Sequence, residues 1–199
     1  PARSRRNEPL KNSAACAKAF KTLRKKFPSS NAQWDDGPVE AIVHAHLLWN
    51  ATARQANTAY RRLMKSVVDL NDLRIQLPSE VKGQVGVNYP QVDERCSRLH
   101  ATLRSIYLRE HDMSLESLSE LGKRDIRQYL ETLDGVTPFV VGRVLSLCYD
   151  TAAMPVDDRT LECLVAAGAC HESTNVSELA AWLTRQVKAD ETVAVHAGL

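Results

Sequence analysis

The sequence has no apolar run that approaches the roughly 20 residues of a membrane-spanning helix, and no apolar segment typical of a signal peptide. We therefore expect no membrane association and, by default, a cytoplasmic protein. The five cysteines are scattered without a CxxC pair, which argues against a disulfide framework and against a zinc site. Three of them, Cys148, Cys163 and Cys170, stand in apolar surroundings that favour buried thiols.

The sequence also lacks the patterns that are typical of β-strands, repeats and metal sites. Alternation of apolar and polar residues with a period of two, which is typical of half-buried strands, is almost absent. There is no internal repeat and no low-complexity segment. His44 and His46 share one apolar segment, but no third ligand stands near them in the sequence, so a structural role is favoured over a metal site.

Apolar residues recur instead at intervals of three and four along most of the chain, which predicts an all-α protein. The pattern is clear after Pro90, at Val92, Cys96, Leu99, Leu103 and Ile106. The apolar segment VEAIVHAHLLWNAT predicts a buried helix that begins after Gly37-Pro38 and continues towards Met64. Asp157 or Asp158, and later Asn175, are placed to cap further helices.

We expect two helical lobes with a cleft between them. A central bundle would comprise residues 38–145, and a second lobe would combine residues 1–37 with residues 146–199. The net charge is only +2, but nine of the Lys and Arg residues precede Phe27 against a single Glu8. A basic arm of this kind suits a polyanionic partner, although a solvated helix face explains it equally well.

The segment from Leu133 to Asp157 combines a helical hairpin with a carboxylate. Gly135 supplies the positive φ that a tight turn between helices needs, and Pro138 suits the first turn of the next helix. The free N–H groups of such a helix start can bind a phosphate, and Arg143 could add charge. The second element is Pro155-Val156-Asp157, which follows the second helix.

Together these residues resemble the helix-hairpin-helix DNA glycosylase superfamily, and most closely its endonuclease III branch. That family has L-x-G-V-G in the hairpin and V-D-T-H about twenty residues later; this chain has LDGVT from Leu133 and VDDR from Val156. The apolar run ending in LWNAT at Thr52 is similar to the family's L-S-A-Q-A-T helix. The segment from Val193 to Leu199 is similar to its H-x-W-L-x-x-H-G segment.

The resemblance implies roles for individual residues. Asp157 would be the catalytic aspartate that stabilises the positively charged sugar as the base leaves. The amides of Gly135, Val136 and Thr137 would hold a phosphate of the DNA. The carbonyls of Glu131, Leu133 and Val136 would bind a monovalent cation beside that phosphate, and Asn50 would fill the gap left by the flipped base.

The departures from the family pattern narrow the expected chemistry. Phe139 occupies the position of the family's catalytic Lys, and a phenyl ring cannot be a nucleophile, so no lyase step is expected. Thr137 replaces the second hairpin Gly, and Asp158 and Arg159 replace the Thr and His of V-D-T-H. The four-cysteine iron–sulfur pattern is absent, so no cluster and no other cofactor is expected.

Two interpretations remain. One is a monomeric, monofunctional DNA glycosylase in base excision repair, which acts on double-stranded DNA and is associated with the nucleoid if the protein is bacterial. The other is a DNA-binding relative of the same fold that has lost the chemistry. An open cavity that exposes the Asp157 carboxylate favours the enzyme, whereas a carboxylate buried in a helix cap, with Phe139 closing the cavity, favours the binding protein.

Overall fold

The structure, a computed structural model, describes residues 14–25 and 34–199. All regular secondary structure in these ranges is helical, which confirms the all-α prediction. The elements in chain order are α1 (Ala14–Arg24), α2 (Pro38–Leu48), α3 (Ala53–Ser66), α4 (Leu70–Ile75), α5 (Pro78–Val85), α6 (Val92–Glu110), the 3-10 helix η1 (Glu116–Glu120), α7 (Lys123–Glu131), α8 (Pro138–Cys148), α9 (Asp158–Ala166), α10 (Val176–Gln186) and α11 (Ala189–Gly198).

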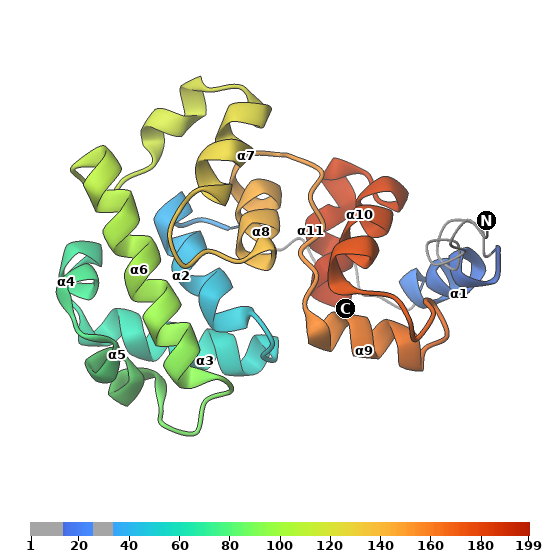
Figure 1. Cartoon of the computed structure of the whole chain (residues 1–199), viewed down its shortest axis with the longest axis horizontal. Coiled ribbons are helices and arrows are strands. Elements are labelled where there is room, and N and C mark those ends of the chain that lie inside the picture. The colour runs from blue at the N-terminus through green and yellow to red at the C-terminus, as the bar shows by residue number, and fades with distance from the viewer. Residues whose placement is uncertain (1–13, 26–33) are drawn as a thin grey trace, which may run out of the picture.

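The helices form two groups, each with its own hydrophobic core (Figure 1). The first core lies among α2 to α8, and the second lies among α1, α9, α10 and α11. Cys148, Tyr149 and Ala153 still pack in the first core, whereas Met154 belongs to the second. The first lobe therefore extends several residues beyond position 145, and the chain crosses between the lobes at Ala153 and Met154.

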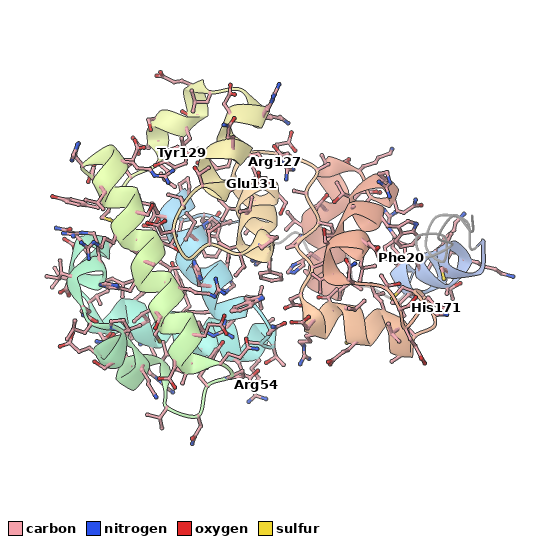
Figure 2. All side chains as sticks on the ribbon, viewed as in Figure 1. Phe20, Arg54, Arg127, Tyr129, Glu131 and His171 are labelled. Atoms are coloured by element: carbon pink, nitrogen blue, oxygen red, sulfur yellow. The ribbon has the colours of Figure 1, made fainter. Side chains whose placement is uncertain are left out.

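Helix α1 joins the second lobe, far along the chain from the helices it contacts. Phe20 of α1 packs edge-on against Trp182 of α10 with ring centroids 5.5 Å apart, and Arg24 pairs with Glu191 of α11 at 2.5 Å. Figure 2 shows Phe20 and His171 in this lobe and Arg54 at the lower end of the other. The rest of the basic arm, including Arg3, Arg5 and Arg6, lies outside the described residues.

Helix α2 forms the centre of the first lobe because nearly its whole surface is apolar and buried. It packs against α8 on one side and against α3 and α6 on the others. Gly37 and Pro38 start it as expected, since proline at the first turn needs no hydrogen-bond partner for its nitrogen. Any side chain on α2 that is polar must therefore find a partner within the protein.

The prediction that this helix continues towards Met64 is wrong. Helix α2 ends at Leu48, and α3 begins at Ala53. Asn50 adopts a left-handed conformation with φ of +52°, which an α-helix does not allow. Thr52 and Gln55 then form a reciprocal capping box that starts the new helix. The break matters because it turns the chain towards the second lobe.

The two later caps are confirmed. Asp157 caps α9 by accepting a hydrogen bond from the N–H of Thr160, and Asn175 forms a capping box with Glu178 at the start of α10. The expectation of buried thiols holds for Cys170. It is wrong for Cys163, which is exposed on α9, and Cys148 is only half-buried. Across residues 14–25 and 34–199, no helix is long and apolar enough to cross a membrane.

Candidate functional site

The Asp157 carboxylate lies where α9 meets the break between α2 and α3. One of its oxygens, Oδ2, accepts a hydrogen bond from the backbone N–H of Asn50 at 2.7 Å. The other, Oδ1, accepts from the N–H and the hydroxyl of Thr160 at 2.9 and 2.7 Å. Asp157 is only 4% exposed. Three donors, the N–H of Asn50 and the N–H and hydroxyl of Thr160, fix its position.

Asn50 links the two lobes at this point. Its side-chain amide donates to the Asp158 carboxylate and accepts from the Asp158 N–H, both at 3.1 Å. The left-handed backbone at Asn50 directs its own N–H to Asp157. The role expected of Asn50, to enter the gap left by a flipped base, stays a prediction and requires these two contacts with Asp158 to open.

The hairpin between α7 and α8 is fastened to α6. The hydroxyl of Thr102 donates to the carbonyl of Asp134 at 2.8 Å, and the N–H of Asp134 donates to the Ser105 hydroxyl at 3.3 Å. Gly135 has φ of +75°, and a side chain there would overlap the carbonyl oxygen of Arg98. Glycine is thus required at this position for two reasons, the backbone conformation and the close approach of α6.

Thr137 caps α8 in place of the glycine that the family pattern has there. Its hydroxyl accepts from the N–H of Val140 at 3.3 Å. In the described part of the chain, the N–H groups of Gly135, Val136 and Thr137 donate no hydrogen bond, as an anion site would require, and their binding of a phosphate stays a prediction. The carbonyls of Glu131, Leu133 and Val136 are the kind of oxygen donor that suits a monovalent cation, and that site stays a prediction.

A cavity of about 540 Å³ lies between the lobes beside Asp157. It is bounded by residues from α2, α3, α8, α9 and α11, including Asp157, Trp34, His44, Phe139, Arg143 and His196. Phe139 is 3% exposed, and its ring packs against the ring of His196 with centroids 5.6 Å apart. Phe139 therefore forms part of a wall, and it leaves the space beside Asp157 open.

Arg143 is expected from the sequence to contact the phosphate at the hairpin. Its guanidinium points towards α11, where Nη1 donates to Nδ1 of His196 at 2.9 Å. The side chain lines the cavity between the lobes. Arg143 thus contacts the second lobe through His196, and the phosphate-binding role expected of it stays a prediction.

The histidines around the cavity are neutral. Burial lowers the pKa of His44 to about 4, and burial with the nearby Arg143 holds the pKa of His196 well below its usual range. His44 shares a hydrogen bond of 2.8 Å with the Asn57 side chain. Elsewhere on α2, His46 shares one of 3.0 Å with Thr102, as expected for a structural residue. No group of three or more metal-binding side chains occurs among the described residues.

Arg95 is a central residue that sequence reasoning missed. It is completely buried, and its guanidinium donates to the carbonyls of His46, Trp49 and Pro90. It thereby joins the end of α2 to the loop before α6. In the sequence, Arg95 stands next to Cys96, which belongs to the apolar stripe of α6. This position alone gives no indication that the Arg95 side chain would find three carbonyl partners.

A basic groove extends from this junction along α3. Arg54 and Arg62 of α3 line it together with the loop of residues 86–89. Helix α3 carries no acidic residue, and Val87 in the facing loop is 65% exposed. The lower end of the first lobe thus presents arginines beside an exposed apolar side chain.

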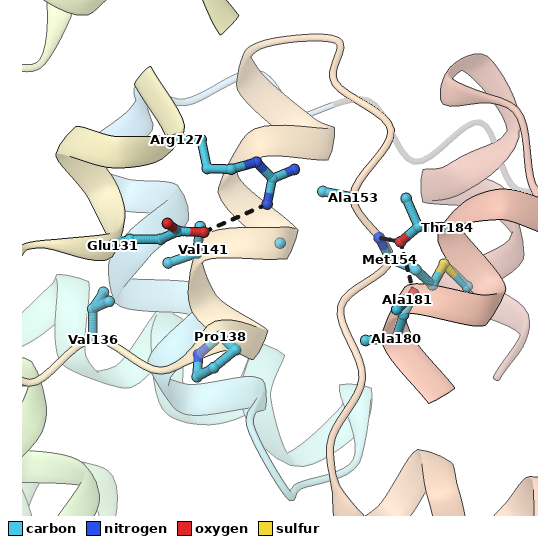
Figure 3. A pocket seen from close by; sticks show the side chains of 11 residues that line it. Arg127, Glu131, Val136, Pro138, Val141, Ala153, Met154, Ala180, Ala181 and Thr184 are labelled. Carbon is cyan, nitrogen blue, oxygen red and sulfur yellow. Dashed lines mark hydrogen bonds and ion pairs between the residues drawn. The ribbon is translucent and has the colours of Figure 1, made fainter. Parts of the chain in front are cut away.

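A second cavity, of about 410 Å³, borders the hairpin on the side of α10 (Figure 3). Arg127 and Glu131 of α7 form an ion pair of 3.6 Å at one wall. At the other, the Thr184 hydroxyl accepts from the N–H of Met154 at 3.1 Å. Glu131 and Val136, two residues of the predicted cation site, line this cavity. The side of the hairpin that faces α10 is therefore open to this cavity.

Solved structures share this arrangement of helices. A trapped endonuclease III–DNA covalent intermediate matches with a TM-score of 0.67 at 17% identity, covering 91% of this chain and 81% of that one. The apo form of Clostridium acetobutylicum 8-oxoguanine glycosylase/lyase matches with a TM-score of 0.62 at 12% identity, covering 96% and 68%. A thermostable thymine-DNA glycosylase matches with a TM-score of 0.61 at 14% identity, covering 91% and 81%.

The chain has the helix-hairpin-helix DNA glycosylase fold. No protein-family model matches the chain, and no curated protein matches it. The resemblance seen in the hairpin and in the segment ending at Asp157 is therefore confirmed at the level of the fold. The roles of individual residues rest on their geometry.

Proposed function

We propose that the protein is a monofunctional DNA glycosylase that hydrolyses the bond between a base and its deoxyribose in double-stranded DNA. The observation that carries this proposal is the Asp157 carboxylate, fixed by three donors on the wall of a cavity of about 540 Å³. Positive charge develops on the sugar as the base leaves, and a fixed negative charge stabilises it without reorganisation. The fold is that of proteins solved in complex with DNA.

Asp157 acts by electrostatics in this proposal. Its oxygens accept three hydrogen bonds, which hold the carboxylate in a fixed position close to the sugar. Water attacks the anomeric carbon. Phe139 offers no amine to the sugar, so the reaction ends with hydrolysis and no covalent enzyme–sugar intermediate forms on this side chain.

DNA would lie across the hairpin and the end of α3. The free N–H groups of Gly135 and Thr137 bind one phosphate, with a monovalent cation on the neighbouring carbonyls. Arg54 and Arg62 contact further phosphates. The DNA is bent at this site, and the exposed Val87 packs against the bases that the bend unstacks. The protein acts as a monomer.

A panel of duplexes tests the proposal. Each duplex carries one uracil, mismatched thymine, alkylated base or oxidised base, and base release is measured with and without alkaline cleavage of the product. We expect release of at least one base, strand cleavage only after alkali, and no adduct on borohydride treatment. A borohydride-trapped adduct would contradict the role assigned to Phe139.

A second candidate function is a DNA-binding protein of the same fold without catalysis. The low exposure of Asp157, 4%, and its use as the cap of α9 favour this alternative. It predicts salt-sensitive duplex binding and no base release from any member of the panel. Release from one lesion decides for the enzyme.

A further inference from the structure

Arg143 is a half-buried cation without a negatively charged partner among the described residues. No described carboxylate pairs with it, and its one hydrogen bond within the described residues is the bond to His196. Its Nε is shielded from solvent and has no hydrogen-bond partner in the described part of the chain. Burial lowers the pKa of Arg143 to about 10, so the guanidinium remains charged at neutral pH. Keeping an unpaired charge away from water costs free energy unless a ligand in the cavity pairs with it.

The surroundings of Arg143 in the cavity do not supply that partner. His44 and His196 are neutral, and the only side-chain carboxylate among the described residues that line the cavity, that of Asp157, is engaged by three other donors. Trp34 and Phe139 provide flat apolar walls. The cavity thus combines aromatic surface with a donor-only cation, which suits a planar ligand that carries acceptor oxygens.

Resting on the function proposed above, we propose that Arg143 is the group that recognises the extruded base, and that it selects neutral bases bearing carbonyl oxygens and rejects cationic alkylated purines. A guanidinium donates hydrogen bonds to carbonyl oxygens, and it repels a base that carries a positive charge. Neutral bases that present an amino group next to a ring nitrogen, such as adenine, offer it fewer acceptors. Arg143 is therefore a specificity determinant of the cavity.

The same contact assists departure of the base. Water forms the new bond to the anomeric carbon and gives its proton to solvent. The carbon–nitrogen bond breaks with its electron pair passing to the base, whose negative charge spreads onto its carbonyl oxygens. Arg143 stabilises that anion until the ring nitrogen takes a proton from solvent. The guanidinium and Asp157 thus act on opposite ends of the breaking bond.

The experiment measures binding of free bases to the whole protein, so it does not depend on catalysis. Barbiturate, which is an anion with three carbonyl oxygens at neutral pH, is titrated beside uracil, cytosine and adenine. Binding is followed by calorimetry and by tryptophan fluorescence, to which Trp34 in the cavity wall contributes. We expect barbiturate and then uracil to bind most tightly, with barbiturate at least about tenfold tighter than cytosine or adenine.

Three variants assign the preference. Arg143→Met removes the charge at similar volume and abolishes the preference, whereas Arg143→Lys retains part of it. Arg159→Met is the matched control, since Arg159 lines the same cavity but is exposed. Urea unfolding confirms that each variant is folded. Equal binding of all four bases, no binding at millimolar concentration, or a preference that survives in Arg143→Met would each overturn the inference. Absence of base release from the duplex panel overturns the proposed enzyme instead, whatever the free bases show.

Discussion

Replacement of Gly135 by alanine tests how the hairpin is built. The backbone there has φ of +75°, a conformation that costs a residue with a side chain about 1–2 kcal/mol. The new Cβ would also overlap the Arg98 carbonyl oxygen and lie 3.1 Å from the Cβ of Ala101. Because a backbone oxygen of α6 cannot rotate away, the hairpin has to move, at a further cost of about 1–3 kcal/mol.

The chain offers a matched control for this experiment. Gly168 has nearly the same conformation, with φ of +67°, but no atom lies within 4 Å of the position that a Cβ would take. Gly168→Ala therefore measures the conformational cost alone. We expect the free energy of unfolding to fall by about 1–2 kcal/mol in Gly168→Ala and by about 2–5 kcal/mol in Gly135→Ala.

Urea denaturation gives the two stabilities, and duplex binding at several salt concentrations gives the functional result. A displaced hairpin loses the contact of Asp134 with Thr102 and misplaces the N–H groups of Gly135 and Thr137. Binding to duplex DNA should therefore weaken in Gly135→Ala and stay unchanged in Gly168→Ala. Equal stability losses in the two variants, or unchanged DNA affinity in Gly135→Ala, would refute the reasoning.

Three further predictions concern the parts that surround the cavity. Asn50→Ala should cost about 1–2 kcal/mol more stability than Asn50→Gly in urea unfolding, because only glycine accepts the left-handed backbone without strain; equal losses would show that this conformation is not strained. Arg95→Met leaves the carbonyls of His46, Trp49 and Pro90 without their donor, so we expect a loss of about 3 kcal/mol or more, and a loss below about 1 kcal/mol would count against the role given to Arg95. Burial lowers the pKa of His44 to about 4 and that of His46 to about 3, so below pH 6.5 the unfolded chain binds protons that the folded chain does not. Stability should thus fall as the pH drops, by about 2 kcal/mol for each of these histidines at pH 5, whereas equal urea midpoints at pH 7 and pH 5 would exclude this linkage.

The sequence predicted the helical class, and it predicted turns and helix starts well where the signal is local. Gly135, Pro138 and the caps at Asp157 and Asn175 depend on backbone geometry within a few residues, and each is found where the sequence indicates. The approach of the hairpin to α6 was not visible, because it depends on Arg98 and Thr102, more than thirty residues earlier in the chain.

The break between α2 and α3 was missed because apolar periodicity continues across it. Asn50 is not a strong helix breaker in sequence, and its left-handed backbone is stabilised by Asp157 and Asp158 from the other lobe. The contact between Arg143 and His196 was not visible in the sequence for a similar reason. The distance of Arg143 from Gly135 along the chain favoured the phosphate, whereas its contact with His196 depends on the packing of α11 against α8.

The most direct test of the account compares base release by the wild type and by Asp157→Asn, on the first lesion that the panel identifies. An amide supplies one acceptor oxygen in place of two, so either the N–H of Asn50 or that of Thr160 loses its partner, at about 1–3 kcal/mol of stability. The comparison is therefore made well below the unfolding transition of the variant, with duplex binding measured alongside. We expect Asp157→Asn to retain duplex binding and to release the base more slowly by about 10²–10³-fold in a single turnover. Release by Asp157→Asn at the wild-type rate would contradict the role given to Asp157.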